Sequence, residues 1–183
     1  MHDAPNTCLS AHGMQGAAAA LKPVAASSYI GPTQVSAVMS DFAKEAGYAF
    51  ENNNVQVTLM NPYFPGTTLS KIKSCARAAG IFYSIDNGVL AIWPVNGSRQ
   101  QDQIPVISPQ SGMLGYPTYS SQGVTVRTLL SAQYGLGKRF TIADSILTPA
   151  NGTWNTLSVE HSMESQTPNG AWFSDILGYR QLA

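Results

Sequence analysis

The stretch GTWNTLSVEHSMESQTPNGAWF (residues 152–173) holds the side chains that come closest to the outline of a catalytic site. Glu160 and His161 are adjacent, Glu164 follows, and Trp154 and Trp172 flank them. A carboxylate beside a histidine can act as a general acid–base pair, and two exposed, coplanar tryptophan rings can bind a sugar. Both kinds of site require the side chains to converge, which depends on the elements that carry them.

We expect residues 153–163 to form a β-strand, whose successive side chains alternate between two faces. One face would hold Leu157, Val159, His161 and Met163, and the other Trp154, Thr156, Ser158 and Glu160. Glu160 and His161 would then point apart and could share a proton only across a bulge. A histidine among apolar neighbours is more often a core or interface residue than a base. Glu164 is expected beside a turn, in solvent, and the tryptophans are expected to close the end of a barrel.

Other motifs give no further candidate site. The sequence contains no G-x-S-x-G and no H-E-x-x-H, and YGLGKRF (residues 134–140) lacks the spacing of a phosphate loop, so we expect a turn there. Cys75 lies on an apolar helical stripe, and Cys8, His2 and His12 have no metal-ligand spacing around them. The sequence therefore predicts no catalytic, cofactor-binding or metal-binding residue, and no enzymatic activity.

The composition limits the classes of partner. Only 11% of the 183 residues are charged, and ten basic residues balance ten acidic ones. The sequence lacks the basic stripe that is typical of a nucleic-acid binder. The most apolar segment, residues 16–26, is interrupted by Lys22 and Pro23 and is too short to span a bilayer. We therefore expect a soluble protein, without sequence-specific nucleic acid or a membrane span, whose surface is covered by protein neighbours.

The first half of the chain predicts a small α+β domain. Residues 1–32 show no sustained period and are expected to form an extended N-terminal arm. Residues 33–94 then read as helix, strand, helix and hairpin. The first helix is expected between an N-cap at Thr33 and Gly47, and the strand at residues 55–59. The hairpin turns at Asn87-Gly88, the pair that most favours a type I′ turn.

The second helix of this domain has its own predicted cap and faces. Thr67 or Thr68 is expected to cap it and Gly80 to end it. Its buried stripe would be Leu69, Ile72, Cys75, Ala76 and Ala79, with Lys71, Lys73 and Arg77 turned outward.

The second half predicts an antiparallel β-barrel. Residues 95–103 are polar and aperiodic, which is typical of a linker, and residues 104–183 read as strands separated by turns. The strands are expected at residues 104–107, 123–130, 138–146, 153–163 and 171–179. The sequence thus predicts an α+β fold, with the small α+β domain followed by the barrel.

The order of several segments resembles the baseplate hub proteins of tailed bacteriophages. The segments are the NPYFPGT loop before a helix, the DNG hairpin ending in IWP, the SGMLGYP turn before GVTVRTLL, and the G-T-W…V-E-H…P-N-G-A-W strand pair. Together they cover about residues 30–180. Hub proteins of this type are usually longer and begin with a further β domain, so the chain is expected to be a shortened hub or part of a longer one.

The resemblance implies a virion protein of the phage tail, assembled in the host cytoplasm. It implies a barrel of the tail-tube type and a homo-oligomer, with a trimeric ring favoured. The implied partners are the tail tube or distal tail protein and the central tip, fibre or tape-measure protein. The ring would line the channel through which DNA leaves. The alternatives that stay open are a carbohydrate- or receptor-binding module at the tail tip and an enzyme acting during infection.

Overall fold

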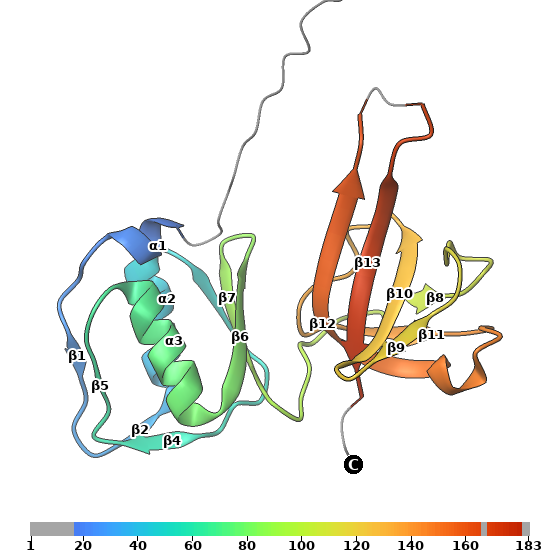
Figure 1. The fold of residues 1–183 in the computed structure, drawn as a ribbon. Coiled ribbons are helices and arrows are strands. Elements are labelled where there is room, and N and C mark those ends of the chain that lie inside the picture. The colour runs from blue at the N-terminus through green and yellow to red at the C-terminus, as the bar shows by residue number, and fades with distance from the viewer. Residues whose placement is uncertain (1–16, 166–167, 181–183) are drawn as a thin grey trace, which may run out of the picture.

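The computed structural model describes residues 17–165 and 168–180, which form two lobes lying side by side (Figure 1). We call residues 17–94 the helical lobe and residues 104–180 the sheet lobe. Each lobe has its own hydrophobic core, one centred on Phe42 and Ile72 and the other on Phe140 and Ile176. The chain is a mixed helix-and-sheet protein, which is compatible with the α+β class predicted from the sequence.

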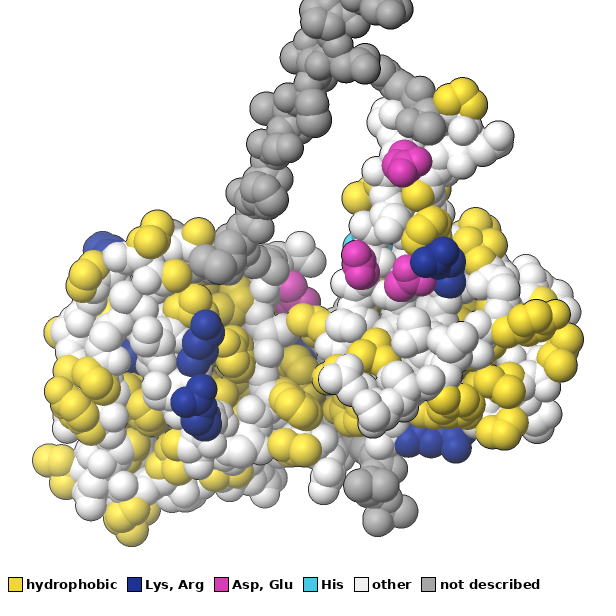
Figure 2. All heavy atoms as spheres, viewed as in Figure 1, with side chains coloured by type: hydrophobic (Ala, Val, Ile, Leu, Met, Phe, Trp, Pro, Cys, Tyr) yellow, Lys and Arg dark blue, Asp and Glu magenta, His cyan; other side chains and the backbone are white. Residues whose placement is uncertain are grey.

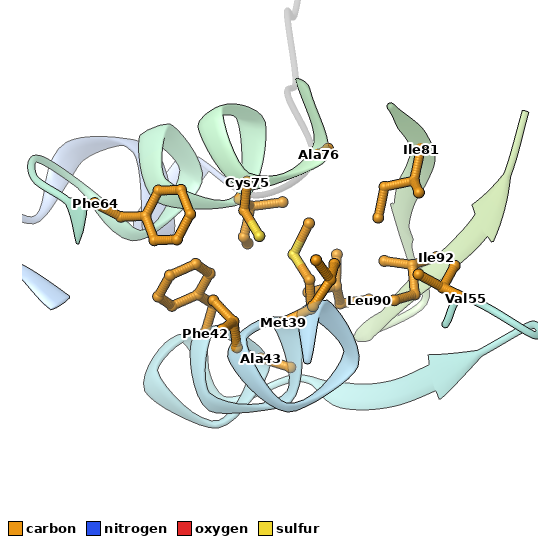
Figure 3. Packing of buried hydrophobic residues seen from close by; sticks show 13 residues of the cluster. Met39, Phe42, Ala43, Val55, Phe64, Cys75, Ala76, Ile81, Leu90 and Ile92 are labelled. Carbon is orange, nitrogen blue, oxygen red and sulfur yellow. The ribbon is translucent and has the colours of Figure 1, made fainter. Parts of the chain in front are cut away.

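Two helices, α2 (Val35–Ala46) and α3 (Thr68–Ala79), pack against each other in the helical lobe (Figure 3). In α2 one face, Val35, Val38, Met39, Phe42 and Ala43, is buried. As predicted, Gly47 ends the helix, with φ of 77°. The predicted cap at Thr33 is wrong, because Thr33 lies in strand β2 (Pro32–Gln34) and pairs with Leu59. Helix α2 therefore begins one residue beyond that strand, after Gln34.

Helix α3 confirms the predicted cap and corrects one predicted face. The hydroxyl of Thr67 accepts a hydrogen bond from Ser70 N, and Gly80 ends the helix with φ of 62°. Lys73 and Arg77 are exposed as predicted, but Lys71 is fully buried. Its ammonium group pairs with Glu45 at 3.1 Å, which explains why a charged side chain can occupy the interior.

The buried Lys71 also holds the first segment of the lobe. Its Nζ donates to Ala25 O at 2.6 Å and to Ser27 Oγ at 3.0 Å. Residues 17–34 contain a short helix and two short strands that pack on the lobe, although the sequence predicted an extended arm up to residue 32. They are α1 (Ala17–Leu21), β1 (Ser27–Ser28), paired with β5 (Tyr63–Phe64), and β2, paired with β4 (Thr58–Met60).

A three-stranded sheet closes the other side of the helical lobe (Figure 1). Strands β6 (Ile81–Asp86) and β7 (Val89–Pro94) form the predicted hairpin. Asn87 and Gly88 both have positive φ, 50° and 75°, as a type I′ turn requires. Strand β3 (Ala49–Asn52), which was not predicted, runs parallel to β7.

The sheet lobe is a six-stranded sheet in the order β8-β11-β12-β13-β10-β9. The strands are β8 (Val106–Ile107), β9 (Thr118–Ser120), β10 (Gly123–Leu129), β11 (Arg139–Ile142), β12 (Gly152–Met163) and β13 (Trp172–Tyr179). A 3-10 turn, Thr148–Ala150, precedes β12. Four of the five pairings are antiparallel, and β8 pairs with β11 in parallel.

The predicted closure into a barrel is not confirmed. The edge strands β8 and β9 have only two and three residues, and they are not paired with each other in the described chain. The sheet curls instead, since Ile107 of β8, Val124 of β10 and Phe140 of β11 share one core. The expected first strand at residues 104–107 is shorter because Pro105 has no N–H for a ladder.

Candidate functional site

Glu160 and His161 lie on opposite faces of β12, as the alternation predicted. His161 pairs with Ser174 of β13, and its Nδ1 lies 2.7 Å from the Ser174 hydroxyl. Glu160 instead lies opposite Asp175 in the register of β12 and β13. Two nitrogens of Arg127 donate to the Asp175 carboxylate, each at 2.8 Å. The histidine and the adjacent glutamate therefore point away from each other and do not form an acid–base pair.

A β-bulge in β12 corrects the predicted faces. The pairing with β13 skips Leu157, so that Thr156 pairs with Gly178 and Ser158 with Leu177. One extra residue reverses the alternation beyond it. As a result Trp154, before the bulge, and Val159, after it, both pack in the core of the sheet lobe, although the alternation placed them on opposite faces.

The two tryptophans lie at opposite ends of the β12–β13 ladder and do not form a sugar platform. Trp154 is 4% exposed and donates from Nε1 to Ala150 O at 2.8 Å. Trp172 is 53% exposed, pairs with Met163, and donates to Glu164 O at 2.9 Å. The Glu164 carboxylate in turn accepts from Ala171 N at 3.2 Å, so this glutamate helps to hold the end of the hairpin.

Arg127 and Asp175 form an ion pair on the β12–β13–β10 face. The Arg127 guanidinium binds Asp175 and lies 3.9 Å from the ring centre of Phe173. Figure 2 shows acidic and basic side chains close together on the sheet lobe, with hydrophobic groups scattered among the white surface around them. Among the described residues, no group of three or more metal-binding side chains lies close enough to hold an ion.

The remaining predicted residues also occupy structural positions. Cys75 is buried in the core of the helical lobe, and desolvation raises the pKa of its thiol to about 12. The YGLGKRF segment is a turn leading into β11, with Gly137 at φ of 73°. Cys8, His2 and His12 lie outside the described residues.

The segment between the lobes is held at several points, which the sequence did not predict. The Arg99 guanidinium is buried and binds Glu51 at 2.8 Å and Asp86 at 2.7 Å. Hydrogen bonds from Arg99 hold the pKa of Glu51 below its usual value. Burial lowers the pKa of Arg99, but its bonds to Glu51 and Asp86 outweigh that effect and raise it.

Residues 99 and 101 also bind the sheet lobe. Arg99 N donates to Gly137 O at 2.8 Å, while the Gln101 side chain exchanges two hydrogen bonds with the backbone of Arg139. Gly137 also lies against the ring of Trp93, so closely that a Cβ at this position would be 2.5 Å from the indole. Residues 95–103 therefore join two lobes that are already in contact.

This contact borders a hollow of about 100 Å³, which we call the inter-lobe groove. Phe82, Tyr83 and Trp93 line it from the helical lobe, and Leu136, Gly137, Thr156, Leu157 and Tyr179 from the sheet lobe. The bulge places Leu157 at the groove, where its side chain is partly exposed. No sequence motif marks these residues, because they come from five separate segments.

The fold and these contacts indicate a structural protein. Its candidate polar residues mostly stabilise strands, turns and the junction between the lobes. The family follows from comparison with known proteins. The family model described as baseplate hub gp41 matches residues 2–172, and the chain therefore belongs to this family of phage tail baseplate proteins. None of the curated proteins matches the chain.

Membership of the family makes the chain a structural component of the virion tail that assembles with other baseplate proteins. In the part of the chain that the structure covers, the helices are too short or too polar to cross a bilayer.

Proposed function

We propose that this protein is a non-enzymatic hub subunit that joins the tail tube to the central tip or fibres of the baseplate. The family match over residues 2–172 carries the proposal. The separation of Glu160 from His161 supports a structural role, since the most suggestive side chains do not converge.

The surface supports assembly into a homo-oligomeric ring, for which we favour a trimer around the DNA exit channel. Among the described residues, β8 and β9 end the sheet with no further strand beside them, and an unpaired strand edge can pair with another chain. We expect it to act as the barrel-type domain of the hub, completed by neighbouring chains in the ring. Large apolar side chains are also exposed on both lobes, as in surfaces that bury obligate interfaces.

The proposal is tested by expressing the chain alone and together with the tail-tube and tail-tip proteins of its phage. Light scattering should give a defined oligomer or a stoichiometric complex with a tail protein. A chain that stays monomeric and binds neither protein contradicts the hub role. Hydrolysis of host peptidoglycan that disappears in Glu160→Ala contradicts the non-enzymatic part, and a tryptophan fluorescence shift on adding host glycans points to receptor binding instead.

A further inference from the structure

Strand β12 has an unpaired edge along its second half, Ser158–Met163, which we call the β12 edge. Strand β11 pairs only with Gly152–Asn155, while β13 pairs with the other side of β12 as far as Met163. Among the described residues, no strand lies beside the β12 edge on the side away from β13. The edge is longer than β8 or β9, which have two and three residues. In Figure 1 the hairpin of β12 and β13 extends beyond the other strands of its sheet.

The ladder with β13 shows which backbone groups of the β12 edge point outward. Glu164 N donates to Ala171 O, which continues the register of the β12–β13 pairs. Alternate residues of an antiparallel strand turn their N–H and C=O groups to opposite sides. Those of Val159, His161 and Met163 therefore point away from β13. A row of outward backbone groups is a template for pairing with another strand.

The charges beside the β12 edge specify the charge of the strand that fits it. Glu160 of β12 lies opposite Asp175 of β13, which in turn lies opposite Arg127 of β10. Arg127 pairs with Asp175, and within the described chain Glu160 has no ion pair. Two carboxylates on opposed positions repel each other, and here only one of them has a counter-charge. A cation on the open side of β12, opposite Glu160, would complete the row.

A hollow on the same face has room for the side chain of that cation. Its volume is about 520 Å³, and Tyr116 lines it together with Glu160 and Asp175. Tyr116 is 67% exposed, so its ring is accessible. A basic side chain can lie against an aromatic ring while its charge meets a carboxylate, as the Arg127 guanidinium does over Phe173 in this sheet.

The opposite face of the β12 edge defines the remaining side chains of the partner strand. Val159, His161 and Met163 lie there, and apolar residues opposite Val159 and Met163 would form stabilising cross-strand contacts. A second copy offers no such strand among the described residues. Its basic strand residues, Arg127 and Arg139, belong to β10 and β11, and each of these strands lies between two others. The partner is therefore a different protein.

We propose that the β12 edge pairs with an extended strand of another tail protein. That strand places a lysine or arginine opposite Glu160 and apolar residues opposite Val159 and Met163. The pairing adds a strand to the sheet lobe and sets the basic side chain in the hollow beside Tyr116. The contact deepens the proposed hub function and rests on it, because it describes how the subunit would hold a different tail protein.

The test measures binding of capped, fluorescent peptides to the full-length chain by fluorescence anisotropy. The probe is VTVRVT, whose pattern follows β10, where the arginine lies opposite Asp175. The control peptide has glutamate in place of arginine, and we expect wild type to bind it about tenfold more weakly. Glu160→Lys should reverse this preference. Asp102→Lys, the same charge change at an exposed residue between the lobes, should keep it.

Variants of His161 test the backbone part of the contact. His161→Pro removes an outward N–H and keeps the ladder to β13, so it should abolish binding of the probe. His161→Ala loses the same bond to Ser174 but keeps the N–H, and should bind as wild type does. Met163→Pro, whose N–H also points outward, should weaken binding as well. Circular dichroism should show that the variants are folded.

A wild-type chain that does not bind the probe overturns the contact. Equal binding of the two peptides, an unchanged preference in Glu160→Lys, or unchanged binding by both proline variants also overturns it. These results leave the hub function standing when the chain still forms a complex with a tail protein. A chain that binds the probe but forms neither an oligomer nor such a complex keeps the edge contact and refutes the hub function, and with it the tail protein as partner.

Discussion

Replacing Arg99 with alanine tests whether the junction between the lobes is a fixed structural element. The Arg99 side chain is 7% exposed and bridges Glu51 and Asp86, which are 34% and 33% exposed. Breaking a fully buried ion pair costs about 3–5 kcal/mol. Because both carboxylates keep contact with water, we expect Arg99→Ala to lower the free energy of unfolding by about 2–3 kcal/mol. Arg99→Lys keeps the charge but loses the planar fork, and should cost about 1 kcal/mol.

The assay is urea unfolding followed by far-ultraviolet circular dichroism, since α2 and α3 both lie in the helical lobe that Arg99 binds. The pKa of Glu51 is lowered in the folded chain, so its ionised form contributes stability above the unfolded value of about 4.3. That contribution disappears as the pH falls through the lower folded value, and the deficit of Arg99→Ala should shrink with it. A deficit below about 0.5 kcal/mol at neutral pH, the range of ordinary surface substitutions, would refute the reasoning.

Three further results are expected. Lys71→Ala should lower the free energy of unfolding by about 3 kcal/mol because it removes the buried cation beside Glu45 and the donor to Ala25 O and Ser27 Oγ. Lys73→Ala, on the exposed face of the same helix, should change it by less than about 0.5 kcal/mol. Gly137→Ala should displace the ring of Trp93 and alter the tryptophan emission, and an unchanged spectrum would contradict the close contact. Cys75 should resist alkylation at neutral pH until the chain unfolds, because burial raises its pKa to about 12; rapid modification of the folded chain, mapped by mass spectrometry, would exclude this.

The longer elements could be predicted because their signals repeat along the sequence. The apolar stripes of α2 and α3 recur each turn, and the glycines that end both helices adopt the expected left-handed conformation. Strand β10 ends one residue before its predicted end, and β12 starts one residue before its predicted start. Strands of two or three residues, such as β1 and β8, are too short to show any period, so the pairs that they form could not be predicted.

Two buried charged residues were missed for a physical reason rather than through a weak signal. Arg99 lies in a polar segment and has no local feature that distinguishes it from a solvated arginine; only the distant Glu51 and Asp86 make it a buried one. Lys71 was likewise assigned to the exposed face because its partner lies on the other helix. A charged side chain can be buried wherever the fold supplies its counter-charge, and a sequence window does not contain that partner.

The bulge at Leu157 determines where along β12 the alternation rule predicts the faces correctly. The alternation rule predicted the separation of Glu160 from His161 correctly, because both lie beyond the bulge and the rule holds within that part of the strand. It failed for Trp154, because one skipped residue reverses every face on the other side. That skipped residue is Leu157, whose side chain lines the inter-lobe groove. The irregularity that limited prediction from the sequence therefore also shapes the surface between the two lobes.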